Sequence, residues 1–131
     1  VNSGLTNRSV TSLAVLGTNL FVGTSDPAQV NGGVFVSTNN GTSWSEVRSG
    51  MTNSDVLSLA VSGTNLFAGT GGNGVFLSTN NGTSWSGVSS GLTGSAVSGT
   101  YVYSLAVSGT NLFAGTGNGV FLSTKNGTSW S

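Results

Sequence analysis

Three nearly identical copies of one short unit make up most of this chain, and this repeat limits the possible folds more than any other feature. The segment SLAVSGTNLFAGT occurs at Ser58–Thr70 and, letter for letter, at Ser104–Thr116, and Ser12–Thr24 differs from it at two positions. Each copy is followed by a block that ends in STNNGTSWS or STKNGTSWS. A unit of about 41 residues cannot bury both of its faces alone, so the units must stack on one another.

Short apolar runs alternate with turn-forming residues inside each unit. In the middle unit the runs predict four strands, at Ser58–Val61, Leu66–Gly69, Val75–Ser78 and Ser84–Val88. Gly63–Asn65 and Gly71–Gly74 predict turns, and Asn81-Gly82 predicts a type I′ hairpin, which needs positive φ at both central residues. No segment shows a helical period. Four antiparallel strands per unit are typical of a β-propeller blade, so we predict an all-β, propeller-like fold of three four-stranded antiparallel blades.

The apolar positions of the middle unit and their equivalents in the other two predict the core. They are Leu59, Val61, Leu66, Phe67, Val75, Phe76, Leu77 and Trp85. We treat 1–131 as a single repeat domain with units at roughly 7–52, 53–93 and 94–131, and residues 1–6 complete a last strand.

The first and last residues of the sequence align with two parts of one strand. Val1–Thr6 aligns with Val47–Thr52, and Ser131 aligns with Ser86. Propellers close with about 4–8 blades, so three blades predict completion by oligomerisation into a ring or a filament, or by a longer chain. Either case places Val1 near a Ser131 of a neighbouring chain, of the same chain or of the next repeat.

The composition excludes several classes of function. Only 5% of the residues are charged, the net charge is zero, and His and Cys are absent. Thiolate metal sites, disulfides and histidine chemistry are therefore excluded. Three cationic residues cannot form the basic patch that nucleic acids require. No run approaches the ~18 apolar residues of a membrane span, and we expect no cofactor.

The STNNGTSW block resembles the Asp-box, or bacterial neuraminidase repeat (BNR), whose pattern is Ser-x-Asp-x-Gly-x-x-Trp. The matching residues are Ser37, Gly41, Trp44, Ser78, Gly82, Trp85, Ser123, Gly127 and Trp130. The resemblance implies a propeller like those of sialidases, sortilins and photosystem assembly factors, in which the box is a structural hairpin away from the active face. The Asp position holds Asn39, Asn80 and Lys125, so all three copies depart from the pattern there.

Each of these motif residues has a structural and a functional interpretation. The tryptophans either fill the wedge between blades, with the indole N–H on a backbone acceptor, or stack on sugar rings. Asn39 and Asn80 either bind their own turn or ligate a cation, and Lys125 at the same place argues against a metal. Four sequons give candidate glycosylation sites at Asn7, Asn40, Asn81 and Asn126, although Asn-Gly also suits the turn.

The carboxylates are too few for hydrolase chemistry. Asp26, Glu46 and Asp55 are the only ones, and we expect Asp26 and Glu46 to occupy different parts of the blades. We therefore predict that the protein is not an enzyme. Asp26, Pro27 and Gln29 belong to the one non-repetitive insertion, which is either a binding loop or tolerated drift.

Two functions remain. The first is a non-catalytic, extracellular or cell-surface repeat module that assembles with itself through blade completion, as the subunit of a surface layer or filament. The second is a glycan-binding or adhesion propeller of the lectin type, which a pocket lined by aromatic and amide groups would favour.

Overall fold

A computed structural model describes residues 1–5, 9–26, 32–52, 55–92 and 99–131 of the chain. Blade 1 consists of β1 (Ser9–Leu16), β2 (Asn19–Ser25), β3 (Gly33–Ser37) and β4 (Ser45–Glu46). Blade 2 consists of β5 (Val56–Ser62), β6 (Asn65–Gly72), β7 (Val75–Ser78) and β8 (Ser86–Gly87). Blade 3 contains β9 (Thr100–Ser108), β10 (Asn111–Thr116) and β11 (Gly119–Ser123).

Consecutive strands of a blade are antiparallel neighbours. In blade 3, Leu122 and Ser131 exchange two backbone hydrogen bonds of 2.9 and 3.0 Å, so the chain begins to pair where a fourth strand would lie. The described residues contain no helix, and hence none that could cross a membrane. The predicted all-β fold of antiparallel blades is confirmed.

Two details of blade 2 differ from the prediction. Gly71 and Gly72 were expected in a turn, but they extend β6 because their backbone pairs with the start of β9 in the next blade. Trp85 was expected in the last strand, but that strand begins one residue later. The reason is that the Trp85 backbone N–H bonds to the Ser49 carbonyl of the preceding linker instead of to β7.

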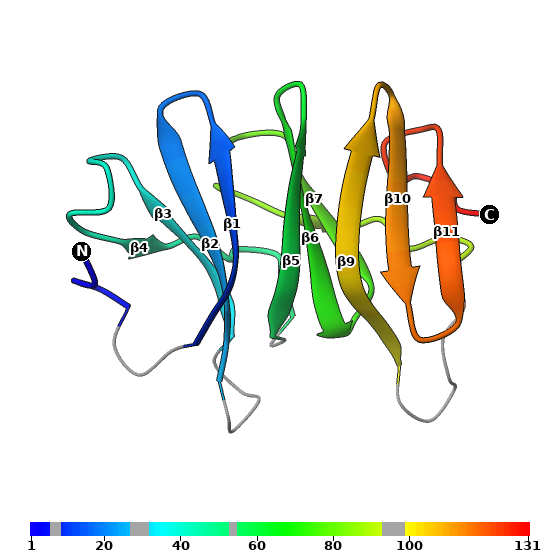
Figure 1. The fold of residues 1–131 in the computed structure, drawn as a ribbon, viewed down its shortest axis with the longest axis horizontal. Coiled ribbons are helices and arrows are strands. Elements are labelled where there is room, and N and C mark those ends of the chain that lie inside the picture. Colours follow the sequence, from blue (N-terminus) through cyan, green and yellow to red (C-terminus); the bar gives the residue numbers. More distant parts are fainter. Residues whose placement is uncertain (6–8, 27–31, 53–54, 93–98) are drawn as a thin grey trace.

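The three blades stand side by side in a row (Figure 1). Their first strands, β1, β5 and β9, are neighbours along this row. The N-terminus lies at the blade 1 end and the C-terminus at the blade 3 end (Figure 1). The chain therefore does not close a ring on itself. Val1 was predicted to lie near a Ser131, and the possibility that this is Ser131 of the same chain is wrong.

Each blade has two apolar faces because successive residues of a strand point to opposite sides. In blade 1 the pairs Leu13–Val22 and Ala14–Phe21 lie on opposite faces of the sheet. We call the face of a blade that points toward the N-terminal end of the row its leading face. The face that points toward the C-terminal end is its trailing face. The trailing face of blade 1 packs on the leading face of blade 2, and blades 2 and 3 repeat this contact.

The hydrophobic core lies between the blades. The first interface contains Phe21 and Val34 from blade 1 and Val56, Leu59, Leu66, Phe76 and Trp85 from blade 2. The second contains Phe67 and Val75 from blade 2 and Val102, Leu112 and Trp130 from blade 3. Every one of these side chains is buried, so neighbouring blades supply each other's cover.

The core prediction is correct for blade 2 but wrong for parts of the two end blades. Leu13 and Val15 are the equivalents of Leu59 and Val61, yet they are 68% and 61% exposed. Val120, the equivalent of Val75, is 74% exposed. The reason is geometric, since the leading face of blade 1 and the trailing face of blade 3 have no neighbour among the described residues.

Because of this difference, two phenylalanines at equivalent positions differ in burial. Phe67 is fully buried between blades 2 and 3, whereas Phe113 is only partly buried on the trailing face of blade 3. We expect Phe67→Ala to lower the free energy of unfolding of the monomer by about 3–5 kcal/mol. We expect Phe113→Ala to cost roughly half of that or less. Chemical denaturation at low protein concentration measures both, and equal losses would contradict the described burial.

Candidate functional site

The hairpins that carry the repeated STNNGTSW block share one backbone geometry. In blade 1, φ is 57° at Asn40 and 84° at Gly41, and the Asn-Gly pairs of the other two blades have similar positive values. The Thr42 N–H donates to the Asn39 carbonyl at 3.2 Å and closes the turn. These are the type I′ turns that the Asn-Gly sequence predicts.

A serine and an asparagine hold each of the first two hairpins together. The buried Ser37 Oγ accepts from the Gly41 N–H at 2.8 Å and donates to Asn39 Oδ1 at 2.9 Å. Asn39 Oδ1 also accepts from the Ser43 N–H at 3.0 Å, and its Nδ2 donates to Ser43 Oγ at 2.8 Å. Ser78 and Asn80 repeat all four bonds in blade 2. The amide of each asparagine thus binds its own turn.

The third hairpin keeps only one of these four bonds. Ser123 Oγ accepts from the Gly127 N–H at 2.8 Å, as in the other blades. Lys125 replaces the asparagine, and an ammonium group has no acceptor atom for the following backbone N–H. Blade 3 therefore lacks the three bonds that the asparagine amide makes in each of the other two hairpins.

The linker that precedes each blade binds the tryptophan of that blade. The Trp85 N–H donates to the Ser49 carbonyl at 2.9 Å, and its indole Nε1 donates to the Val47 carbonyl at 2.8 Å. The same two bonds join Trp130 to Ser90 and Val88, and Trp44 to Ser3 and Val1. Residues 1–5 thus occupy the place of linkers 47–51 and 88–92. Trp85 and Trp130 are buried between blades, so neither presents its ring to a sugar.

The candidate glycosylation residues lie in the exposed hairpin turns. Asn40, Asn81 and Asn126 each hold the first central position of a type I′ turn, and their side chains are exposed. Asn7 lies outside the described residues. Exposure in a turn is compatible with an attached glycan, and glycosylation stays a prediction.

The carboxylates of Glu46 and Asp55 lie close to the glycine pair 32–33. Glu46 Oε1 lies 3.1 Å from Arg48 Nε, and Arg48 Nη1 donates to the Gly32 carbonyl at 2.9 Å. Asp55 Oδ1 accepts from the Asp26 N–H at 3.0 Å and lies beside Gly32. Asp26 follows β2 and Glu46 lies in β4, so the two residues belong to different elements of blade 1, and the expectation that they occupy different parts of the blades stays a prediction. The described contacts tie the ends of the β2–β3 connection to blade 2 and to the following linker. Pro27 and Gln29 of the candidate binding loop lie outside the described residues.

The leading face of blade 1 is the first of two uncovered apolar faces. Val10, Leu13 and Val15 are 48%, 68% and 61% exposed, whereas their equivalents Val56 and Leu59 in blade 2 are at most 9% exposed. The part of this face that Val22 and Phe35 form is covered, because Leu5 packs with both in a separate cluster. The exposed part follows β1.

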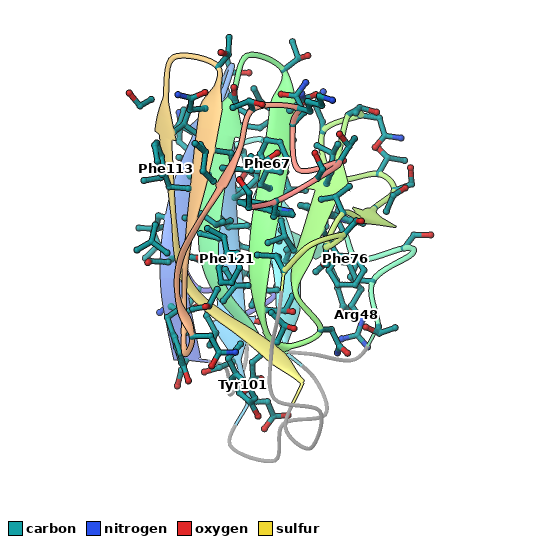
Figure 2. All side chains as sticks on the ribbon, turned by 90° about the vertical axis from the view of Figure 1, so that its right-hand side faces the viewer. Arg48, Phe67, Phe76, Tyr101, Phe113 and Phe121 are labelled. Carbon is teal, nitrogen blue, oxygen red and sulfur yellow. The ribbon has the colours of Figure 1, made fainter. Side chains whose placement is uncertain are left out.

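The trailing face of blade 3 is the second uncovered face, and Figure 2 views the molecule from this side. Val120 is 74% exposed, although its equivalents Val34 and Val75 are fully buried. Phe113 on the same face is partly buried, whereas Phe67, the equivalent residue of blade 2, is fully buried; both are labelled in Figure 2.

A close contact between a valine and a glycine aligns each pair of blades, and the sequence analysis missed it. A Cβ on Gly23 would lie 2.7 Å from Val56 Cγ1, and a Cβ on Gly69 would lie 2.7 Å from Val102 Cγ1. Only glycine leaves room for the valine of the next blade. The available signal was a glycine inside a strand, which often marks a close approach by another chain segment.

An open groove of about 550 Å³ lies between blades 1 and 2 at the turn end of the blades. Its lining residues are Leu16, Gly17, Thr18, Asn19, Thr64, Thr79 and Asn81. Hydroxyl and amide groups dominate, and neither a charged nor an aromatic side chain is among them. The groove can offer neutral hydrogen-bond partners but no ring for stacking.

Comparison with solved structures shows the β-propeller fold. The chain matches an ancestral GH74 enzyme with a TM-score of 0.71 and 26% identity over 98% of its length. It matches the GH74 enzyme of Niastella koreensis with 0.66 and 19% over 92%, and YCF48 of Cyanidioschyzon merolae with 0.69 and 13% over 95%. The chain spans only 19%, 21% and 37% of these three proteins, respectively. No sequence-family model and no curated protein matches it.

The difference between the hairpins gives a test of the asparagine network. We expect Lys125→Asn to add the missing bonds to the third hairpin and to raise the free energy of unfolding by about 1 kcal/mol. The matched control is Asn80→Lys, which removes the same bonds from blade 2 and should lower it by a similar amount. Thermal and urea unfolding measure both changes. A destabilised Lys125→Asn variant would show that the network contributes nothing to this hairpin.

Proposed function

We propose that this chain is a non-catalytic structural module that assembles with other copies of itself through its two end faces. The main evidence is that both end faces expose apolar residues whose equivalents in the other blades are buried. Val120 is 74% exposed where Val34 and Val75 are 0% exposed. We further propose an extracellular or cell-surface setting, in which such a module forms part of a layer or filament.

The physical properties of the end faces support assembly. An exposed apolar patch that continues along a sheet face favours association, because burial removes that area from water. The net charge is zero and charged residues make up 5% of the chain, so little electrostatic repulsion opposes contact between copies. The edge strands at both ends also carry backbone groups that can pair with another chain.

The described carboxylates support the non-catalytic part of the proposal. Glu46 is engaged by Arg48, and Asp55 accepts a backbone hydrogen bond from Asp26. These contacts hold the fold together at one bend, and the chain has neither His nor Cys to act as a base or nucleophile. Likeness to two GH74 enzymes extends over about a fifth of each of those proteins. We propose that the likeness concerns the blade and not the activity.

Native mass as a function of concentration tests self-assembly. We expect light scattering to give masses above the 13.0 kDa of one chain, with the mass falling on dilution. Val120→Lys places a charge on the trailing face of blade 3 and should shift the protein to the monomer. Because Val120 is exposed within the chain, this change leaves the monomer fold intact. Thr83→Lys, at an exposed hairpin position, is the control with the same charge. A wild-type protein that stays monomeric at every concentration would contradict the proposal.

The groove between blades 1 and 2 favours a second candidate function, the binding of neutral glycans. Its amide and hydroxyl lining suits sugar hydroxyl groups, although the aromatic residue that many sugar sites use is absent from the lining. Thr64→Trp would fill this groove, while Thr110→Trp makes the same change at the equivalent position of blade 3. In a glycan-array screen, a signal that only Thr64→Trp abolishes supports this candidate. No signal from the wild-type protein excludes it for the glycans tested.

A further inference from the structure

We infer that the two end faces are complementary halves of one interface, so that blade 3 of one copy packs onto blade 1 of a second copy in a single, head-to-tail register. This inference rests on the proposed self-assembly and adds its partner, its direction and its contact residues. The interface between copies reproduces the interface that already joins blade 2 to blade 3.

The residues of the two end faces match those of the internal interface almost completely. The trailing face of blade 3 carries Ala106, Ser108, Phe113, Gly115, Val120 and Leu122, and blade 2 has the same residue types at the equivalent positions. The leading face of blade 1 carries Val10, Leu13, Val15, Leu20, Val22, Phe35 and Trp44, which differ from those of blade 3 only by Val22 in place of Ala114. Val22 is 1% exposed in a single copy, because it packs with Leu5 and Phe35.

The valine–glycine contact defines the register. Val56 fills the slot over Gly23, and Val102 fills the slot over Gly69. The third valine of the series, Val10, is 48% exposed. At the third glycine, Gly115, the three atoms nearest to a built Cβ all belong to Ser104 of the same blade, and no valine is among them. Val10 at one end of a copy thus has no glycine to pack over. Gly115 at the opposite end of a second copy has no valine over it.

A phenylalanine–glycine contact repeats the same relation elsewhere on the faces. The hairpin glycine of blade 2, Gly82, lies against Phe21 of blade 1 and Val47 of the linker, and Gly127 lies against Phe67 and Val88 in the same way. Gly41, the equivalent in blade 1, has only its own Trp44 within 4 Å of a built Cβ. Phe113 is the phenylalanine that would cover it from a second copy. Two separate contacts therefore require the same orientation of the two copies.

The contact is directional, because a valine face meets a glycine face. Two leading faces would bring valine against valine with no slot on either side, and two trailing faces would leave both slots empty. A head-to-tail contact repeats from copy to copy, and it forms a ring where the rotation closes and a filament where it does not. Two copies would supply six blades, within the range of about 4–8 that closes a propeller.

Engineered cysteines test this register, and the chain has no cysteine of its own. In the internal contact the Cβ of Val102 lies 3.1 Å from a Cβ built on Gly69, close to the ~3.5–4.5 Å that a disulfide spans. We mix Val10→Cys with the double variant Ser104→Ala/Gly115→Cys under mild oxidation. The alanine removes the Ser104 Oγ, which would crowd the new side chain. We expect a covalent dimer at twice the mass of one chain, and only in the mixture.

The internal contact supplies a matched positive control. The triple variant Ser58→Ala/Gly69→Cys/Val102→Cys places the same pair inside one chain, so it should form an intrachain disulfide at unchanged mass. This control also shows that the glycine position accepts a cysteine without loss of the fold. Thr83→Cys mixed with Ser104→Ala/Gly115→Cys, which should not link, measures random cross-linking.

The outcomes separate this inference from the proposed function. A wild-type protein that stays monomeric in light scattering overturns both. A wild-type protein that assembles, with the internal control linked and the mixture unlinked, overturns the register while self-assembly stands. Dimers of Val10→Cys alone, in excess of the Thr83→Cys background, would show two leading faces in contact and would also overturn it.

Discussion

The covering of one blade by the next is the constraint on which the rest of this structure depends. A four-stranded sheet of alternating apolar and small residues has two faces to cover, and each blade supplies only half of two interfaces. Phe21 and Val34 are fully buried only because blade 2 lies over them, and Val120 is exposed because no described residue does the same for blade 3. Stability in such an array is a sum of weak units and strong neighbour contacts.

The hairpins and linkers convert this packing into a fixed geometry. Ser37 and Asn39 make four hydrogen bonds that hold the turn in which the Asn-Gly pair has positive φ. The turn sets the position of the tryptophan, whose indole N–H then reaches the preceding linker. Polar bonds determine where each blade sits relative to the last one, and apolar contacts supply the burial.

Much of the fold could be predicted from the sequence because the same pattern of strands and turns occurs three times. Strand order, the type I′ turns and the buried positions of blade 2 follow from periodicity and from Asn-Gly chemistry. The exposure of Leu13 and Val15 could not be predicted by copying blade 2, because it depends on what lies beside the blade. The role of Gly23 and Gly69 also could not be predicted. Glycine is needed there because a valine of the next blade packs against it, and not because of the glycine's own conformation. The contacts of Asp55 with Asp26 and Gly32 depend on a connection that the other units do not repeat.

The bond between each tryptophan and the linker before it also has a consequence for how the chain is made. Linker 47–51 is synthesised before Trp85, and linker 88–92 before Trp130. The backbone acceptors for each new tryptophan are therefore already outside the ribosome when that residue emerges. A newly made blade can dock on a finished one without waiting for residues further along, so the order of synthesis and the order of docking coincide.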